Sequence, residues 1–234
     1  MQDLHGAFAA AIQLLLHLDA DLMEIVGLSL GVSLAALLLA SAVGLPLGAV
    51  LAVLRFPGRR VLSVLLNALM GLPPVVVGLL VYIVLSRSGP LGGLGWLFTP
   101  KAMVVAQWLL ITPIVAALSR QVVEDLWEEY SEQLRSLGAR PLRAVPTLLW
   151  DGRFRLLTTV LAGFGRAIGE VGAVIIVGGN IAHVTRVMTT AITLETSKGD
   201  LPLALGLGLV LLLMSLLVNA AASTAGVLAR RGEA

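Results

Sequence analysis

The chain has 234 residues, of which 58% are hydrophobic and 13% are charged, and its formal net charge is +2. A soluble domain carries about twice that share of charged residues, so the composition excludes an ordinary soluble protein and indicates an integral membrane protein. The absence of cysteine excludes disulfides, thiolate zinc sites and cysteine nucleophiles.

The N-terminal segment is predicted to be a short helix on the outer surface of the membrane. It carries Asp3 and no Lys or Arg, so we expect no cleavable signal peptide. Residues 4–18 are too few to cross a bilayer and carry a narrow polar stripe of His5, Gln13 and His17, which is typical of an interfacial helix. The two histidines lack an acidic partner at ligand spacing, which favours a solvated face over a metal site.

Five apolar stretches are long enough to cross a bilayer as helices. They are residues 25–54, 61–86, 102–119, 156–178 and 201–228. Only the fourth contains charged residues. The predicted fold class is therefore an all-α integral membrane protein, with five transmembrane helices plus the N-terminal interfacial helix in a single transmembrane domain over residues 1–234.

Lys and Arg gather on one side of these five spans, and the positive-inside rule makes that side cytoplasmic. The basic residues on this side are Arg55, Arg59, Arg60, Arg120, Arg135, Arg140, Arg143, Arg153, Arg155, Arg230 and Arg231. The other side carries only Arg87, Lys101, Arg186 and Lys198. We therefore predict a multi-pass protein of the cell (inner) membrane whose N-terminus is outside and whose C-terminus is cytoplasmic.

Residues 120–155, between the third and fourth spans, hold 12 charged residues, six of each sign. The segment begins with apolar residues at helical spacing, namely Val122, Val123, Leu126, Trp127, Tyr130 and Leu134. It then meets Gly138, which permits a left-handed turn, and Pro141, which cannot continue a helix interior. We predict a helix, a sharp turn and a second short helix. The alternative is a solvated loop, but Trp127, Tyr130, Leu134 and Leu137 favour a docking surface for a cytoplasmic partner.

Within this segment the stretch "EQLRSLGA", residues 132–139, resembles the EAA-type signature of ABC importer permeases. In that family the segment is a coupling helix in a groove of the ATP-binding subunit. The resemblance assigns coupling to the ATPase subunit to Glu129, Glu132, Leu134, Gly138 and Ala139. There are departures, because Gln133 and Leu134 replace two alanines and the expected Leu-Pro ending is Trp150-Asp151.

Two further stretches narrow the resemblance. "GLPPVVVG", residues 71–78, and "RAIGEVGAVIIVGGNI", residues 166–181, are similar to the molybdate, tungstate and sulfate permeases, and residues 166–181 most resemble the tungstate branch. The resemblance implies the type I ABC importer permease fold and a homodimer with the route along its two-fold axis. It also implies two ATP-binding subunits, an extracytoplasmic substrate-binding protein and contact with membrane lipid, and no nucleic acid.

The sequence contains no phosphate-binding loop of the form G-x-x-x-x-G-K-[ST] and no zinc-protease motif. We therefore expect a chain that is not an enzyme and that binds no cofactor or metal of its own. If it takes part in active transport, ATP and Mg²⁺ are bound by a partner subunit.

Arg166 and Glu170 are the charged residues inside the fourth span. In a continuous helix Arg166 lies about 15 Å and Glu170 about 21 Å from Leu156, near the middle of the bilayer. Charges there face a protein interior or a water-filled cavity. Their spacing lets them pair on one helix face. They are either a structural pair that fixes the helix register or part of the translocation pathway or its gate. A stripe of small residues at Gly165, Gly169 and Ala173 lets another backbone come close.

Other pathway candidates are backbone features. Pro73 and Pro74 are expected to disturb the second span, because proline removes a helical hydrogen bond. Gly178, Gly179 and Asn180 end the fourth span, and their N–H groups are candidates for a weak anion site. The alternative for these three residues is a plain helix stop.

The leading hypothesis is the permease subunit of an ATP-driven oxyanion importer, for tungstate first, then molybdate, then sulfate. An ABC permease for another small solute is the alternative, and a passive channel or scaffold is a weaker one because it leaves residues 120–155 unexplained. An intramembrane enzyme would need clustered ionisable groups inside the spans, which hold only Arg166 and Glu170.

Overall fold

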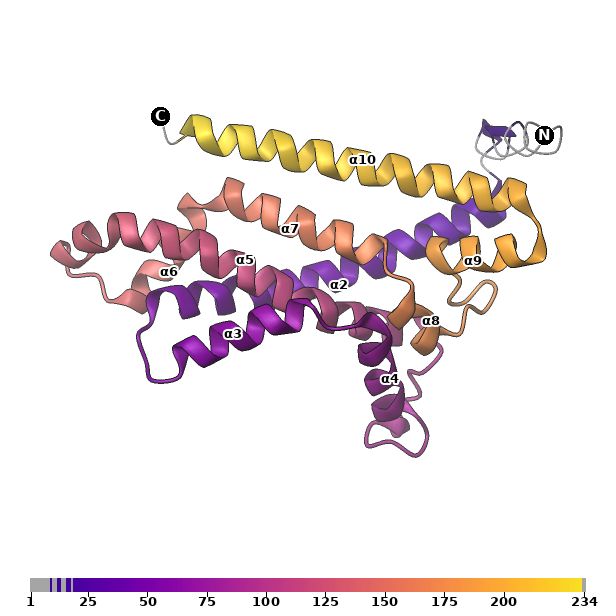
Figure 1. The fold of residues 1–234 in the computed structure, drawn as a ribbon, viewed down its shortest axis with the longest axis horizontal. Coiled ribbons are helices and arrows are strands. Elements are labelled where there is room, and N and C mark those ends of the chain that lie inside the picture. The colour runs from indigo at the N-terminus through magenta and orange to yellow at the C-terminus, as the bar shows by residue number, and fades with distance from the viewer. Residues whose placement is uncertain (1–8, 10–11, 14–15, 18, 233–234) are drawn as a thin grey trace. The chain divides into compact units, whose positions relative to one another are not determined.

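The computed structural model describes residues 9, 12–13, 16–17 and 19–232. The predicted interfacial helix over residues 4–18 lies largely outside them. Every regular element in the described residues is a helix (Figure 1). The elements are α2 (Ala20–Val53), α3 (Arg59–Met70), α4 (Pro74–Leu85), the 3-10 helix η1 (Gly92–Leu94), α5 (Pro100–Ser136), α6 (Pro141–Asp151), α7 (Arg153–Ile168), α8 (Gly172–Gly178), α9 (Met188–Lys198) and α10 (Leu201–Gly232).

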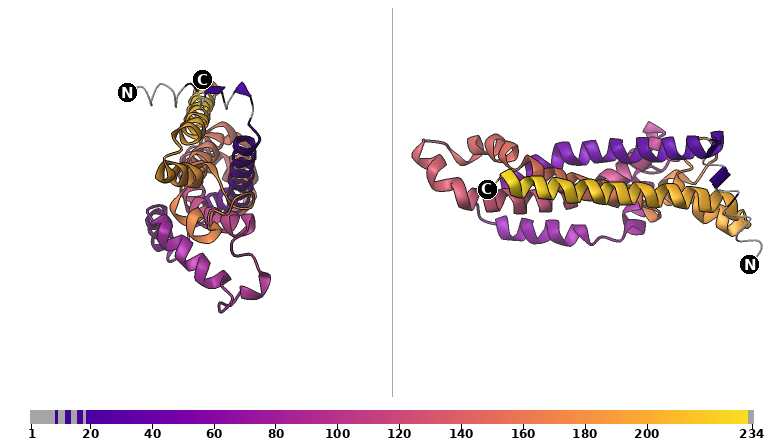
Figure 2. Two further views of the ribbon diagram at one scale, coloured as in Figure 1. Left: turned by 90° about the vertical axis from the view of Figure 1, so that its right-hand side faces the viewer. Right: turned by 90° about the horizontal axis from the view of Figure 1, so that it is seen from above.

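Three of the described helices, α2, α5 and α10, are long and apolar enough to cross a membrane, and Figure 2 shows α10 as one unbroken rod. Two bent pairs, α3 with α4 and α7 with α8, pass the same test only when each pair is taken as one span. The described residues therefore confirm an all-helical fold with three to five candidate membrane spans, and the count of five is reached only if both bent pairs cross.

The break between α3 and α4 confirms the disturbance predicted at Pro73 and Pro74. Helix α3 ends at Met70, where the N–H of Gly71 donates to Ala68 O and the N–H of Leu72 donates to Leu69 O. Pro73 has extended backbone angles and Pro74 is the first residue of α4, where its missing N–H costs no helical hydrogen bond. The carbonyl of Pro73 accepts from the N–H groups of Val76 and Val77, so this carbonyl is bonded within α4.

The expectation of one continuous helix over residues 156–178 is wrong. Helix α7 ends at Ile168 and α8 begins at Gly172, so Gly169 and Glu170 lie in the break. The N–H of Glu170 donates to Ala167 O, a tight turn that replaces the regular helical bond. The predicted distance of about 21 Å from Leu156 to Glu170 assumed a continuous helix and is therefore wrong. The prediction that Arg166 and Glu170 lie on one face of the same helix is wrong for the same reason.

Two helices depart from the sequence expectation in length or existence. The predicted third span and the helix predicted to start at residue 120 form one helix, α5, which runs from Pro100 to Ser136. Helix α9, Met188–Lys198, was not anticipated, because its mixed sequence of threonines and charged residues has no long apolar run. Its Glu195 is buried and accepts from Lys198 Nζ at 2.9 Å.

The chain divides into two compact units. The first is Met1–Ala35, Pro73–Gln107 and Ala167–Leu217, and within it α8 packs against α4 (Figure 1). The second is Ala36–Leu72, Trp108–Arg166 and Val218–Ala234. Its core joins the end of α2, the second half of α5 and α6 around Ala52, Val123, Trp127 and Leu148.

Candidate functional site

The turn between α5 and α6 has the backbone hydrogen bonds of a Schellman motif. The N–H of Ala139 donates to Leu134 O and the N–H of Gly138 donates to Arg135 O, both at 2.9 Å. Gly138 has φ +77°, the left-handed conformation that this motif requires and that was predicted at this position. Three of the predicted coupling residues, Leu134, Gly138 and Ala139, therefore also build the turn that redirects the chain.

The apolar residues of the predicted docking segment mostly face the chain's own core. Contrary to the expectation from the sequence, their presence is therefore not an indication of a surface for a cytoplasmic partner. Trp127 is buried, and Tyr130 and Leu134 pack against the same core cluster. Arg135 lies over the Trp127 ring, 5.5 Å from its centroid. Of the four side chains that favour a partner surface in the sequence, only Leu137 is strongly exposed, at 83%. The other three are explained by the packing of α5 on α6.

A surface groove nevertheless lies beside this turn, and its volume is about 350 Å³. It is lined by Tyr130, Gln133, Leu134, Leu137, Thr147, Leu148 and Asp151. Trp150, which stands where the family pattern has leucine, does not line the groove; it is 72% exposed, with the Arg153 guanidinium 5.1 Å from its ring centroid. A groove lined by several leucines, one of them the exposed Leu137, can take an apolar side chain from another surface.

The two predicted coupling carboxylates, Glu129 and Glu132, are exposed, and neither pairs with a described residue. They differ in this from Glu124, one turn earlier on α5. Its carboxylate accepts from Arg59 Nη2 at 2.6 Å and also pairs with Arg120. Arg59 in addition donates to Leu51 O and Ala52 O at the end of α2. Glu124 thus anchors α5 to the end of α2, whereas Glu129 and Glu132 leave their charge to solvent or to a partner.

Glu170 is buried, with 4% of its surface exposed, and it organises the start of α8. Its Oε1 accepts from the N–H of Ala173 at 3.0 Å, and its carbonyl accepts from Thr189 Oγ1 at 2.8 Å. A carboxylate at a helix N-terminus is favourable, because the first N–H groups of the helix have no partner within it. This placement gives Glu170 a structural role that its position in the sequence did not reveal.

A small polar cavity of about 10 Å³ adjoins Glu170. It is lined by Ser29, Ser33, Gln107, Ile168, Glu170, Val187, Met188 and Thr189. Gln107 Nε2 donates to Ala167 O at 3.1 Å, while its Oε1 is buried without a hydrogen-bond partner among the described residues. Sequence reasoning passed over Gln107, although an amide within an apolar span is the signal that would have singled it out.

The other predicted residues of this region have different environments. Arg166 is half-buried in the last turn of α7, and Gly165 and Gly169 are exposed. A Cβ added at Gly165 would meet only Val218 Cγ1, at 4.0 Å. The predicted stripe of small residues does not continue along one helix, because Ala173 belongs to α8 and lies beyond the break.

Gly178, Gly179 and Asn180 end α8 as predicted. Gly179 has φ +72° and Asn180 has φ +50°, and the N–H of Gly179 donates to Ile175 O, which is a regular helix stop. The Asn180 Nδ2 donates to Thr190 O. Since the N–H of Gly179 is engaged within the chain, it is not available to an anion in this arrangement.

Comparison with known proteins identifies the family of the chain. Residues 44–229 match the family model described as the binding-protein-dependent transport system inner membrane component. The chain belongs to this family. It is therefore a permease, a non-catalytic multi-pass subunit of the inner membrane, and its family implies a binding protein and an ATPase as partners.

Several relatives are similar over most of the chain. The tungstate uptake system permease protein TupB of Peptoclostridium acidaminophilum is 42% identical over 94% of this chain and 96% of its own. A probable anion ABC transporter permease protein of Haloferax volcanii is 40% identical over 85% of this chain and 88% of its own. The sulfate transport system permease protein CysT of Salmonella typhimurium is 32% identical over 75% of this chain and 66% of its own.

Proposed function

We propose that this permease carries an oxyanion into the cell at the expense of ATP, and that the oxyanion is tungstate. The observation that supports this is the 42% identity to TupB over 94% of the chain, against 32% to the sulfate permease CysT. Molybdate is the next candidate and sulfate follows. A permease for another small anion is the alternative that the Haloferax volcanii relative favours.

The substrate is tested on the cognate binding protein, because in a binding-protein-dependent system that protein selects the solute. Titration with tungstate, molybdate and sulfate should give the lowest Kd for tungstate. Uptake into proteoliposomes that contain the permease, its ATPase and the binding protein should follow the same order and require ATP. A lower Kd for sulfate than for tungstate would contradict the substrate, and uptake without the ATPase would favour a passive channel.

Residues 120–155 form the proposed coupling segment. Its contact surface consists of the groove, which Leu134 and Leu137 help to line, and of the carboxylates Glu129 and Glu132. Gly138 and Ala139 hold the turn that shapes it. Burial of one leucine side chain in the contact with the ATPase subunit contributes about 1.5–3 kcal/mol to the free energy of binding. Loss of that side chain therefore weakens binding of the ATPase subunit at least about tenfold. Because Leu137 is 83% exposed, Leu137→Asp should leave the permease folded and reduce the ATPase that co-purifies with it.

Leu142→Asp is the matched control, since Leu142 is 54% exposed on α6 but does not line the groove. We expect this variant to keep its ATPase and its coupled uptake. Equal retention of the ATPase by both variants would place the contact surface elsewhere on the chain.

We further propose that the breaks in the two bent pairs border the translocation pathway, with Pro73 and Pro74 at one, and Gly165, Arg166, Gly169 and Glu170 at the other. Gly178, Gly179 and Asn180 at the end of α8 belong to the same proposal. Glu170→Gln retains an Oε1 that accepts from Ala173 while it removes the charge. If Glu170→Gln reduces uptake at least about tenfold while the abundance of the permease is unchanged, the result would support a role of Glu170 in the pathway. Unchanged uptake would assign Glu170 a structural role alone.

The remaining assembly follows the family pattern. We propose a type I importer fold with five crossings, a homodimer with two ATP-binding subunits, the N-terminus outside and the C-terminus cytoplasmic. The chain has no cysteine, so single cysteines report topology directly. An impermeant maleimide should label Ser88→Cys but not Ser136→Cys in intact cells, and the reverse pattern would overturn the orientation. Native mass spectrometry of the purified complex should give two permease copies.

A further inference from the structure

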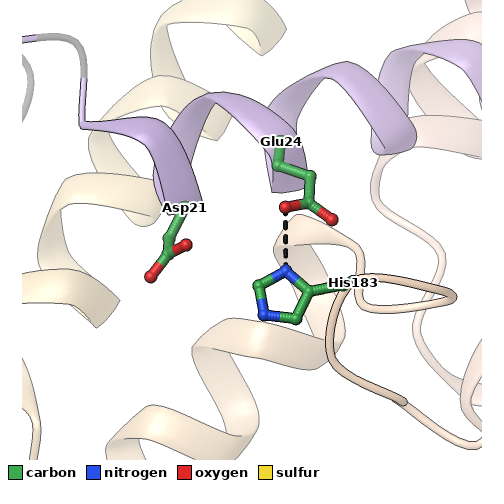
Figure 3. A group of neighbouring side chains, drawn as sticks. All are labelled: Asp21, Glu24 and His183. Atoms are coloured by element: carbon green, nitrogen blue, oxygen red, sulfur yellow. Dashed lines mark hydrogen bonds and ion pairs between the residues drawn. The ribbon is translucent and has the colours of Figure 1, made fainter.

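Three side chains that can bind a metal converge at the start of α2. Asp21 and Glu24 lie on the first turns of this helix, and His183 lies in the loop between α8 and α9 (Figure 3). His183 Nδ1 is 2.9 Å from Glu24 Oε2. One ligand atom from each of the three residues lies within 4.8 Å of the other two. In Figure 3 the Glu24 carboxylate reaches the imidazole, and the Asp21 carboxylate projects from the same side of α2.

The spacing of these atoms is close to that of a tetrahedral zinc site. Zn²⁺ binds imidazole nitrogen and carboxylate oxygen at about 2.0–2.2 Å, which places two ligand atoms about 3.3 Å apart at the tetrahedral angle. The pair His183 Nδ1 and Glu24 Oε2 is already near this separation at 2.9 Å. The longest separation in the group, at most 4.8 Å, closes by rotation of exposed side chains.

The backbone on each side of the group is held in place. Asp19 Oδ1 accepts from the N–H groups of Asp21 and Leu22, which fixes the first turn of α2. In the loop, Thr185 Oγ1 accepts from the N–H of Ile181 and donates to Gly178 O at 2.6 Å, and Thr185 is buried. His183 is therefore presented by a bonded turn rather than by a loose one.

The charges also suit a dication. Asp21 and Glu24 are three residues apart, so they lie on the same helix face and bring two negative charges to the group. Arg186, three residues after His183, is 3.9 Å from the buried Glu195. Because one ligand is an imidazole, the set fits zinc better than calcium or magnesium, which take oxygen ligands.

We propose that Asp21, Glu24 and His183 form a binding site for Zn²⁺, which joins the loop between α8 and α9 to the start of α2. Three protein ligands leave the fourth position of the ion to water. The site is independent of the transported solute and of the ATPase, and it goes beyond the transport function proposed above.

The test uses tag-free permease in detergent. Bound metal is first removed with EDTA, and the EDTA is then removed from the sample. Zn²⁺ should raise its Tm and bind at one site per chain in a calorimetric titration, whereas Mg²⁺ should do neither. His183→Gln and Glu24→Gln should each weaken the apparent Kd at least about tenfold. His5→Gln/His17→Gln is the matched control, since it removes the other two histidines of the chain and should bind Zn²⁺ like the wild type.

Three results would overturn the site. They are no response of the wild type to Zn²⁺, an unchanged Zn²⁺ response in His183→Gln, and a response abolished in the control that lacks His5 and His17. Each can be judged without a transport assay, so failure of this proposal and failure of the proposed function are distinguishable.

Discussion

Gly78 of α4 and Ala173 of α8 bring the backbones of their helices into direct contact. A Cβ added at residue 78 would lie 2.7 Å from Ala173 Cα and 3.0 Å from Ala173 O. Real Cβ atoms do not approach backbone this closely, so α4 and α8 can pack as they do only with glycine at position 78. Small residues at a helix–helix contact have this effect in membranes, where close van der Waals packing drives association.

We expect Gly78→Ala to destabilise the permease by about 1–3 kcal/mol, the range for an overpacked contact. The measurement is the midpoint of thermal or denaturant unfolding in detergent. Gly31→Ala on α2 is the matched control, because a Cβ there meets nothing within 4 Å. In a helix interior that change should be neutral or stabilising by about 0.5–1 kcal/mol. Equal stability of the two variants would contradict the close contact.

Of the two helix breaks that precede α4 and α8, one was predictable from the sequence and the other was not. The break before α4 was predictable, because Pro73 and Pro74 act locally on the backbone. The break between α7 and α8 was not. It depends on a buried carboxylate, Glu170, that caps Ala173, and a run of apolar residues with two charges has the same composition whether the helix is continuous or broken.

Arg59 is the anchor of the end of α2, and its guanidinium fork explains a second prediction. It donates to Leu51 O at 2.8 Å, to Ala52 O at 3.0 Å and to Glu124 Oε1 at 2.6 Å. The last carbonyls of a helix have no partner within it, so these bonds stabilise the end of α2. Lysine keeps the charge but lacks the fork. We expect Arg59→Lys to lower the free energy of unfolding by about 1–2 kcal/mol.

Arg60→Lys provides the control for this measurement, because Arg60 is exposed and pairs with no described residue. Its effect should stay within about 0.5 kcal/mol. A double-mutant cycle of Arg59→Gln with Glu124→Gln should give a favourable coupling of roughly 0.5–1.5 kcal/mol, since both side chains are partly buried. Zero coupling would mean that Arg59 acts on α2 alone.

Gly138 tests the backbone conformation of the turn between α5 and α6. A Cβ at this position meets nothing within 4 Å, so steric clash is not at issue, but φ is +77°. L-residues pay about 1–2 kcal/mol in the left-handed region, and asparagine pays least. The unfolding midpoints should therefore rank wild type, then Gly138→Asn, then Gly138→Ala. If alanine and asparagine gave equal losses, the left-handed turn would not control stability here.

The candidate coupling segment was the most predictable part of the site, for the same local reason. Glycine and proline at positions 138 and 141 dictate a turn between two helices whatever surrounds them. The packing partner of the apolar residues in this segment was not predictable. Whether Trp127 faces the chain's own core or a partner depends on α6 and the end of α2, and helical spacing alone does not distinguish the two.

The ion pair of His183 and Glu24 predicts a small dependence of stability on pH. The hydrogen bond that the Glu24 carboxylate accepts from His183, and then the Glu24 charge, raise the pKa of His183 above 6.5. Desolvation lowers this pKa by a smaller amount, and the still smaller effects of Asp21 and Arg186 raise and lower it respectively. A raised pKa means that the folded state binds the proton more tightly than the unfolded state does. The stabilisation is therefore complete below pH about 6.5 and is lost as pH rises through the folded-state pKa.

An NMR titration of the histidine ring signals, in EDTA to remove metals, measures this pKa directly. Glu24→Gln should return the His183 pKa most of the way toward 6.5, and Asp21→Asn should lower it less, because Glu24 is both the hydrogen-bond partner and the larger charge effect. Both shifts should shrink in high salt, since the pair is exposed and salt screens it. A His183 pKa that is the same in wild type and Glu24→Gln would contradict the pairing of His183 with Glu24.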